Sequence, residues 1–262
     1  METMRLGKTN LRVSSLGFGG IPIQRLTEEE AIRIVQRCLD AGITFIDTAH
    51  GYTTSEERIG KAIAGRREGL VLATKSHALD GRSFGEDLEQ SFQRLGVQYI
   101  DLVQFHNISN QEQYDQVTAP GGPLEVLREA QAAGRVGHIG VTSHNLDMAL
   151  KMVPSGHFET LMFPFCLATT EPAEELIPLC ERHDVGFIAM KPMGGGLLED
   201  ATLAFKYLRQ FPSVLPLVGM QTMAEIKQNV AVMEGPAEIS ATERAAMERI
   251  GQEMDIRYCR GC

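Results

Sequence analysis

Three ionisable side chains stand where short apolar runs of the sequence end. They are Asp47, Lys75 and His106, and Tyr52 follows five residues after Asp47. An ammonium held by a carboxylate favours ionisation of a nearby phenol, and an imidazole can hydrogen-bond a carbonyl oxygen. Together these groups could deliver the proton of a phenol to a carbonyl.

Each of these residues also has an ordinary structural explanation when it is considered alone. An Asp after a strand is often a turn or cap residue, and a Lys at a strand end usually extends to water. A single His is more often a hydrogen-bonded core residue than a catalyst. These explanations weaken together, because Asp47, Lys75 and His106 follow three successive predicted strands and would share one rim.

The secondary-structure elements that must position these four side chains alternate between short apolar runs and longer amphipathic segments. The predicted strands are 15–19, 42–47, 70–74, 99–105, 136–142, 159–165, 185–190 and 214–219. The predicted helices are 27–40, 55–64, 84–95, 123–133, 145–153, 171–183, 200–210 and 222–233. Such alternation predicts a parallel sheet, and eight units without a long linker predict an α/β fold closed into a (β/α)8 TIM barrel.

Local signals at the ends of the chain extend this prediction. Thr27 and Glu30 form a capping-box pattern before the first helix. The first 14 or so residues read as an N-terminal β-hairpin, and 240–254 reads as an extra C-terminal helix. We expect one barrel domain over 1–255, followed at 256–262 by the start of a possible iron–sulfur segment.

Composition narrows the functional class. The chain has 262 residues, 43% of them hydrophobic, and a formal net charge of −9. The acidic balance argues against a nucleic-acid partner, and no apolar stretch reaches the ~20 residues that a membrane span needs. The N-terminus lacks a signal-peptide layout, so we expect a cytoplasmic protein whose Cys38, Cys166 and Cys180 are buried free thiols.

Several motifs occur in a fixed order along the chain. They are Asp47-Thr48-Ala49-x-x-Tyr52, Ser55-Glu56-x-x-Ile59-Gly60-x-Ala62, Thr74-Lys75, Asp101-Leu102-x-Gln104-x-His106, Gly140-Val141-Thr142-Ser143 and Lys191-Pro192-Met193-Gly194. Across residues 4–235 this set resembles the aldo-keto reductases. The resemblance implies an NAD(P)H-dependent oxidoreductase that reduces an aldehyde or ketone, or oxidises the alcohol, with Asp47, Tyr52, Lys75 and His106 as catalytic residues.

The resemblance also implies a nicotinamide site, although no G-x-G-x-x-G follows a strand in a Rossmann context. Gly19 and Gly20, with Asp47, would lie near the nicotinamide ribose, and Thr142 and Ser143 would meet the carboxamide. The implied pyrophosphate and adenosine contacts are Pro192, Met193, Gly194, Gly219, Gln221, Glu225 and Asn229. Simple loop geometry is the alternative explanation for these glycines and threonines.

Three positions depart from the family pattern. Met162 stands where many relatives have a glutamine for the carboxamide, and Met190 stands where many stack an aromatic ring on the nicotinamide. A thioether can still pack against a ring. Glu225 falls where many NADP-preferring relatives have an arginine, and a carboxylate there would repel a 2′-phosphate. We therefore expect the chain to accept NAD, while the choice between NAD and NADP stays open.

A second signal lies in Cys259 and Cys262, a C-x-x-C pair. One subgroup of the family is similar in having Lys-Pro-x-Gly-Gly-Gly and a C-terminal cysteine cluster of the type that binds [4Fe–4S] in ferredoxins. Two cysteines are half of such a ligand set, so either the other ligands lie beyond this sequence or the resemblance ends here. The pair keeps open an alternative function, a nucleotide-binding electron-transfer subunit with a redox partner.

Two further points remain open in the sequence. The histidines His50, His77, His138 and His144 permit a metal-dependent hydrolase, but they show no H-x-H or H-E-x-x-H spacing. The segment 107–122 after His106 reads as a short loop, which favours an open pocket but does not identify the substrate.

Overall fold

Eight parallel strands close into a barrel, as the sequence predicts. The computed structural model describes residues 1–198 and 200–255, with side chains up to residue 251. Around the barrel the strands follow one another in chain order from β3 to β10, and β10 pairs with β3 to close it. Their bounds are β3 Gly17–Gly19, β4 Phe45–Asp47, β5 Val71–Ser76, β6 Ile100–Phe105, β7 Val136–Thr142, β8 Thr160–Pro164, β9 Gly186–Met190 and β10 Val214–Gly219.

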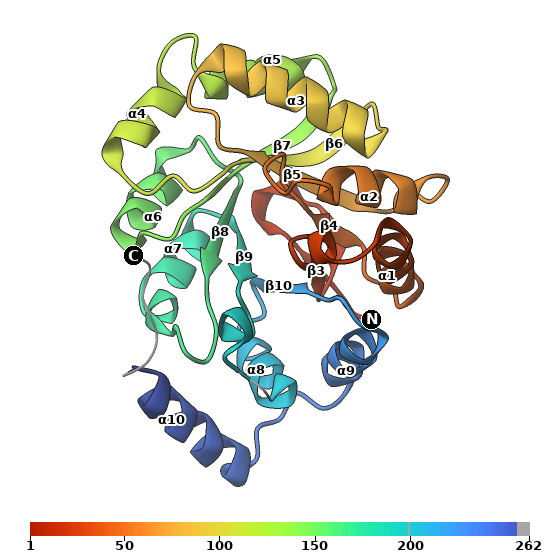
Figure 1. Cartoon of the computed structure of the whole chain (residues 1–262). Coiled ribbons are helices and arrows are strands. Elements are labelled where there is room, and N and C mark those ends of the chain that lie inside the picture. Colours follow the sequence, from red (N-terminus) through yellow and green to blue (C-terminus); the bar gives the residue numbers. More distant parts are fainter. Residues whose placement is uncertain (199, 256–262) are drawn as a thin grey trace.

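Helices surround the strands as a ring (Figure 1). They are α1 Glu28–Asp40, α2 Ser55–Ile63, α3 Gly81–Leu95, α4 Gln111–Thr118, α5 Pro123–Ala132, α6 Leu146–Met152, α7 Leu176–Arg182, α8 Ala201–Leu208 and α9 Met223–Glu234. Short 3-10 turns cover Gly7–Thr9, Pro22–Arg25, Val153–Ser155, Glu171–Ala173 and Gly194–Gly196. The capping box of Thr27 and Glu30 is present, and Gly96 ends α3 with a left-handed φ of 65°. No helix in the described ranges has the length and hydropathy needed to cross a bilayer.

The inward faces of the strands form a closed apolar interior below the mouth. Phe45, Ala73 and Leu102 belong to one buried cluster inside the barrel. Because side chains alternate between the two faces of a strand, Asp47, Lys75 and Gln104, two residues further along their strands, also face inward. The polar residues therefore lie above the apolar layer, at the carboxyl ends of the strands.

The outward faces of the same strands pack under the helices. Ile46, Leu72 and Val103 are buried in the larger apolar cluster, which includes Phe84 and Phe92 of α3. Burial on both faces fixes the register of each strand, since a slip by one residue would exchange the two faces.

The N-terminal hairpin closes the opposite end of the barrel. Strands β1 Thr3–Arg5 and β2 Arg12–Ser14 pair antiparallel, as predicted. Leu6, between them, is 0% exposed and joins the interior cluster. Arg5 forms an ion pair of 2.6 Å with Asp184, which ties the hairpin to the loop before β9.

Two segments differ from the sequence prediction. Residues 107–122, expected to be a short loop, contain α4, whose first turn is capped by the Asn110 side chain on the amide of Gln113. The predicted helix 171–183 is divided into a 3-10 turn at Glu171–Ala173 and α7. The expected C-terminal helix is α10, Ala241–Asp255, which lies outside the ring at the lower left of Figure 1.

We predict that Leu6→Ala lowers the free energy of unfolding by about 2–5 kcal/mol, because it leaves a cavity in the closed end of the barrel. Urea denaturation followed by circular dichroism would measure the loss, with exposed Thr3→Ala as the control. A loss below about 0.5 kcal/mol would show that the hairpin does not support the interior.

Candidate active site

A buried ion pair lies at the mouth of the barrel. The Lys75 ammonium donates to Asp47 Oδ2 at 2.5 Å and to the Thr48 carbonyl at 2.6 Å. Gln104 donates through Nε2 to Asp47 Oδ1 at 3.1 Å. The Lys75 and Asp47 side chains are 2% and 3% exposed. Desolvated charges of this kind are tolerated when they are paired and fully hydrogen-bonded.

Tyr52 lies beside this pair, on the loop between β4 and α2. Lys75 Nζ is 5.0 Å from the centroid of the Tyr52 ring. The His106 ring approaches the same tyrosine edge-on, with centroids 5.5 Å apart and planes at 80°. The four side chains that the sequence places after three successive strands therefore meet at one point of the mouth.

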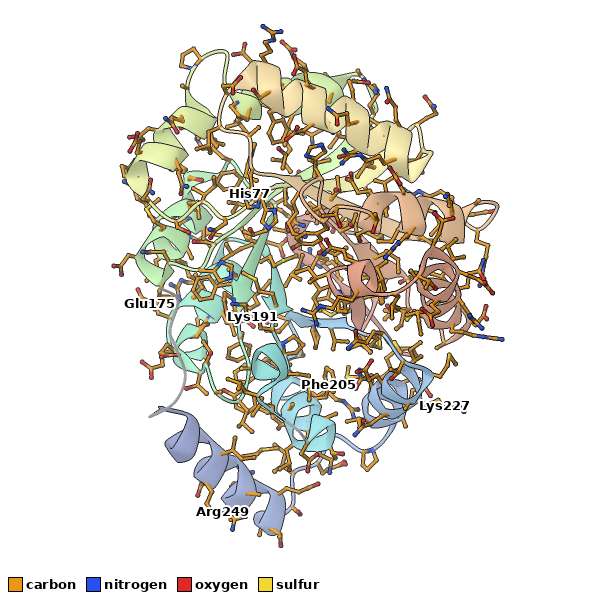
Figure 2. The ribbon with its side chains drawn as sticks, in the orientation of Figure 1. His77, Glu175, Lys191, Phe205, Lys227 and Arg249 are labelled. Carbon is orange, nitrogen blue, oxygen red and sulfur yellow. The ribbon has the colours of Figure 1, made fainter. Side chains whose placement is uncertain are left out.

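A second histidine covers the His106 ring. The rings of His77 and His106 stack with centroids 3.7 Å apart and planes 14° from parallel. His77 Nδ1 is 3.0 Å from the His106 carbonyl, so this nitrogen carries a proton that it donates. The Nδ1 of His106 is buried without a partner in the described part of the chain. In Figure 2 His77 lies near the middle of the ring of helices.

The surroundings determine the charge on Lys75 and Tyr52. Burial is the largest influence on Lys75 and lowers its pKa, but Asp47 and Tyr52 together raise the pKa above its usual value. Burial also dominates at Tyr52 and raises the pKa of the phenol. The Lys75 ammonium lowers that pKa, as expected from the sequence, but it does not outweigh burial. The site therefore holds an ammonium and a protonated phenol near neutral pH.

His106 is held in its neutral form. Burial, and then the positive charge of Lys75 with smaller contributions from His77 and His144, lowers the pKa of His106 to about 2. Because the buried Nδ1 meets no acceptor in the described part of the chain, the neutral imidazole is most stable with its proton on Nε2. It can thus donate a hydrogen bond without carrying a charge.

The glycines proposed for the ribose lie next to this site. Gly19 pairs with Asp47 on one side and with Gly219 on the other. Gly20 donates its amide to the Asp47 carbonyl at 2.8 Å. A Cβ on Gly219 would fall 2.4 Å from Cγ of Pro22. Close packing thus explains glycine at 219 without reference to a ligand.

Thr142 is the last residue of β7, and Ser143 directly follows it. The Thr142 hydroxyl accepts from the Asn107 amide at 2.7 Å, and the Ser143 hydroxyl accepts from the Asn145 amide at 3.1 Å. Both residues are buried. Their hydroxyls already support the loops that leave β6 and β7, so any contact to a ligand would be additional to these bonds.

The segment Lys191–Gly196 leaves β9 in an unusual backbone conformation. Lys191, Gly194, Gly195 and Gly196 all have positive φ, from 57° to 100°. A side chain on Gly195 or Gly196 would meet no atom within 4 Å. The amides of Gly194 and Gly196 already donate to the carbonyls of Lys191 and Met193, at 2.8 and 2.9 Å. The exposed part of the turn, Gly195 and Gly196, therefore allows a ligand to approach the backbone closely but does not offer these two amides to it. Lys191 lies near the middle of the ring in Figure 2, whereas Lys227 lies on the outer helix α9.

The start of α9 uses Glu225 structurally. Its carboxylate accepts from the amides of Gln221 at 2.7 Å and Thr222 at 2.9 Å, which completes a capping box. A negative charge therefore already occupies the helix N-terminus. Asn229 lies one turn further along α9 and is buried.

The two methionines that depart from the family pattern lie in one cluster. Met162 of β8 is 2% exposed, and Met190 at the end of β9 packs against the same interior cluster. Met162 therefore contributes to the barrel interior, and Met190 lies at its upper boundary.

The described residues do not form a cluster of metal ligands. No group of three or more His, Cys, Asp or Glu within them is placed to hold a metal ion. Cys38, Cys166 and Cys180 are buried free thiols, and burial raises the pKa of Cys180 to about 12. Cys259 and Cys262 lie outside the described residues.

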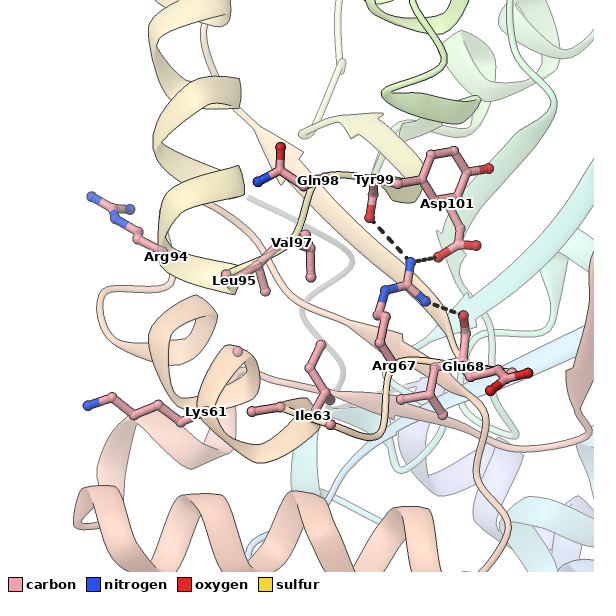
Figure 3. A pocket seen from close by; sticks show the side chains of 16 residues that line it. Lys61, Ile63, Arg67, Glu68, Arg94, Leu95, Val97, Gln98, Tyr99 and Asp101 are labelled. Carbon is pink, nitrogen blue, oxygen red and sulfur yellow. Dashed lines mark hydrogen bonds and ion pairs between the residues drawn. The ribbon is translucent and has the colours of Figure 1, made fainter.

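A separate cavity of about 810 Å³ lies at the other end of the barrel, between the ends of α2 and α3 (Figure 3). Arg67 crosses it to bind Asp101 and the carbonyl oxygens of Leu70 and Tyr99. Its lining residues precede β5 and β6 in the chain, except Asp101, which is the second residue of β6. Lys75 lies near the carboxyl end of β5, and His106 directly follows β6. This cavity is therefore remote from the Lys75–Asp47 ion pair and from Tyr52.

Sequence reasoning missed two residues of the site. Gln104 was part of a motif, but its bond to Asp47 was not expected. The alternation Leu102, Gln104, His106 on one face of a strand could have indicated it. The sequence indicates His77 only as a candidate metal ligand, and no local pattern predicts its stacking on His106.

Comparison with known proteins gives one consistent result. The model of the aldo/keto reductase family matches residues 15–203. The uncharacterized oxidoreductase YrpG of Bacillus subtilis is 31% identical over 233 residues, which cover 78% of this chain and 70% of that protein. L-galactose dehydrogenase of Arabidopsis thaliana is 29% identical over 220 residues, covering 76% and 68%.

Solved structures share the fold. The aldo-keto reductase AKR11C1 of Bacillus halodurans, in its holo form, superimposes with a TM-score of 0.83 at 24% identity, covering 95% of this chain and 96% of that one. An aldo/keto reductase of Klebsiella pneumoniae in complex with NADP and acetate gives 0.76 at 22% identity, covering 95% and 94%.

The depressed pKa of His106 predicts a loss of stability in acid. Below about pH 6.5 the unfolded chain binds a proton at this residue that the folded chain does not bind, so unfolding becomes easier as the pH falls. We expect His106→Gln to remove up to about 1.4 kcal/mol per pH unit of this dependence between pH 6 and 4. Urea titrations at several pH values would measure it, with exposed His183→Gln as the control. Equal slopes in wild type and His106→Gln would contradict a neutral buried imidazole.

Proposed function

We propose that this chain, which belongs to the aldo/keto reductase family, is an NAD(P)H-dependent oxidoreductase that reduces an aldehyde or ketone. One observation carries the proposal: the buried Lys75 ammonium lies between the Asp47 carboxylate and the Tyr52 ring, with the neutral His106 beside that ring. A phenol, an ammonium and a neutral imidazole around one point form a site for protonating a carbonyl oxygen.

Tyr52 is the proton donor in this proposal. Its raised pKa keeps the phenol protonated near neutral pH, so that a proton is present when a carbonyl arrives. Once the proton has left, the Lys75 ammonium stabilises the phenolate, and Asp47 keeps that ammonium in place. Burial strengthens both interactions, because fewer water molecules screen the charges.

His106 orients the carbonyl. A neutral imidazole with its proton on Nε2 donates a hydrogen bond to an oxygen and does not compete with Tyr52 as the acid. The stacked His77 limits rotation of the ring, and its bond to the His106 carbonyl fixes the backbone at the same place.

A nicotinamide cofactor fits the residues around this site. A bound reduced nicotinamide would supply the hydride. Gly19 lies beside Asp47, and the turn at Gly195 and Gly196, where an added side chain would meet no atom within 4 Å, lets a diphosphate approach the backbone closely. We propose that Thr142 and Ser143 hold the carboxamide, and that Met190 packs against the ring.

The adenosine end would lie at the start of α9, near Gly219, Gln221, Glu225 and Asn229. The Glu225 carboxylate occupies the helix N-terminus there, where a 2′-phosphate would otherwise be stabilised. We therefore propose that NADH is accepted. No observation on the described residues favours the alternative of an electron-transfer subunit with a [4Fe–4S] cluster.

We predict that Tyr52→Phe lowers kcat by about 100-fold or more, since it removes the proton donor. The Kd for NAD(P)H, measured by fluorescence, should stay within about twofold, because the ring is retained. Tyr99→Phe, at an exposed tyrosine on the opposite end of the barrel, is the matched control. Near-normal turnover of a simple aldehyde by Tyr52→Phe would contradict its role as the acid.

We predict that Glu225→Gln raises the ratio of kcat/KM with NADPH to kcat/KM with NADH by about tenfold. Glutamine can replace glutamate in a capping box, so the helix start is kept while its negative charge is lost. Steady-state kinetics with both cofactors would measure the ratio, and Glu248→Gln on α10 controls for net charge. An unchanged ratio would remove Glu225 from cofactor selection.

A further inference from the structure

One face of α3 lies against the loop that carries Tyr52. Asp87, Gln90 and Arg94 are spaced by three and four residues, which places them on the same side of the helix. All three contact a single residue, His50, which stands two positions before Tyr52.

Every polar atom of His50 faces a polar atom of another residue. Its amide donates to the Lys75 carbonyl at 2.8 Å, and its carbonyl accepts from Arg94 at 3.2 Å. The ring nitrogens Nδ1 and Nε2 lie 3.4 Å from Asp87 Oδ1 and 3.3 Å from Gln90 Oε1. The loop is thus fixed both through its backbone and through this ring.

Asp87 also holds the strand that carries Lys75. Its second oxygen, Oδ2, accepts from the hydroxyl of Ser76 at 2.5 Å. Ser76 directly follows Lys75 and, by the alternation of β5, faces outward to α3 while Lys75 faces the interior. The Asp87 carboxylate therefore contacts both the loop that carries Tyr52 and the strand that carries Lys75, on the side that faces α3.

The loop needs such support because its backbone is strained. Thr53, next to Tyr52, has a φ of +34°, a conformation that β-branched residues rarely adopt. Conformations of this kind persist only where the surroundings fix them. The Thr53 hydroxyl donates to Gln24 at 2.7 Å on one side, and the contacts of His50 hold the loop on the other.

We propose that Asp87 and His50 are positioning residues, which set the Tyr52 phenol against the Lys75 ammonium without contacting substrate or cofactor. For its catalytic consequence this inference rests on the proposed reductase function. Its structural part, that α3 immobilises the loop 48–54, does not depend on that function.

The kinetic test compares Asp87→Ala with Glu86→Ala. Glu86 is the preceding residue of the same helix, exposed and paired with Arg82, so it is a matched control. We expect Asp87→Ala to lower kcat by about 10- to 100-fold. The KM for a simple aldehyde and the Kd for NAD(P)H should stay within about twofold, and Asp87→Asn should restore part of kcat. An unchanged kcat, or equal losses in Asp87→Ala and Glu86→Ala, would overturn the proposal.

A second variant approaches the same contact from the loop. His50→Ala should reduce kcat to a similar extent, and the double variant Asp87→Ala/His50→Ala should lose no more than the worse single variant, since both act through one link. Losses that multiply would show two independent effects and would contradict the shared link.

Hydrogen exchange tests the inference without any turnover. The His50 and Tyr52 amides, which donate to Lys75 and Ala49, should exchange about tenfold faster in Asp87→Ala, and peptides from β8 and β9 should not change. Unchanged exchange over 48–54, or faster exchange throughout the chain, would contradict a local positioning role. A wild type that reduces no carbonyl would refute the proposed function, and exchange would still decide whether α3 holds the loop.

Discussion

The ammonium of Lys75, buried at the mouth of the barrel, influences the protonation of the side chains around it. Removing one partner of such a pair costs about 3–5 kcal/mol, because the other charge is then left without compensation. The partner, Asp47, comes from the neighbouring strand, and the register that pairs Asp47 with Ala73 brings Lys75 to its carboxylate. The charged state of Lys75 and Asp47 therefore depends on the register in which β4 and β5 pair. The same charge disfavours protonation of His106 and counteracts the effect of burial on Tyr52.

The two faces of β5 make different kinds of contact at the site. Lys75 points inward to the chemistry. Thr74 and Ser76 point outward, where they bind Glu56 of α2 at 2.6 Å and Asp87 of α3 at 2.5 Å. Hydrogen bonds to helices, rather than apolar contacts alone, thus fix the upper end of the strand. Through these bonds, residues of the surrounding helices influence the position of Lys75 inside the barrel.

The sequence predicts the barrel well because the signals are local and repeated. Short apolar runs, caps such as Thr27 with Glu30, and glycines after helices all favour the same alternation. It also predicts that Asp47, Lys75 and His106 share one rim, since parallel strands end at the same edge. The helix α4 was missed because its eight residues are mostly polar and bury only Val117 among the residues described.

Other features depend on contacts between distant parts of the chain, which no local pattern carries. The stacking of His77 on His106 and the links of Asp87 to His50 and Ser76 are of this kind. The net pKa of Tyr52 was not predictable either, because burial, which dominates it, depends on tertiary packing. Glu225 is a different case. Thr222 and Glu225 form the same capping pattern as Thr27 and Glu30, and the sequence already contained that signal.

The alternation along β5 also bears on how the chain can change over generations. Deleting or inserting one residue before Lys75 in this strand would turn Ser76 inward and Lys75 outward, towards the helices, and would remove the ammonium from the site. The stretch 107–122 lies between strands and already accommodates α4. A change in the length of this segment leaves unchanged which side chains of the strands face the interior.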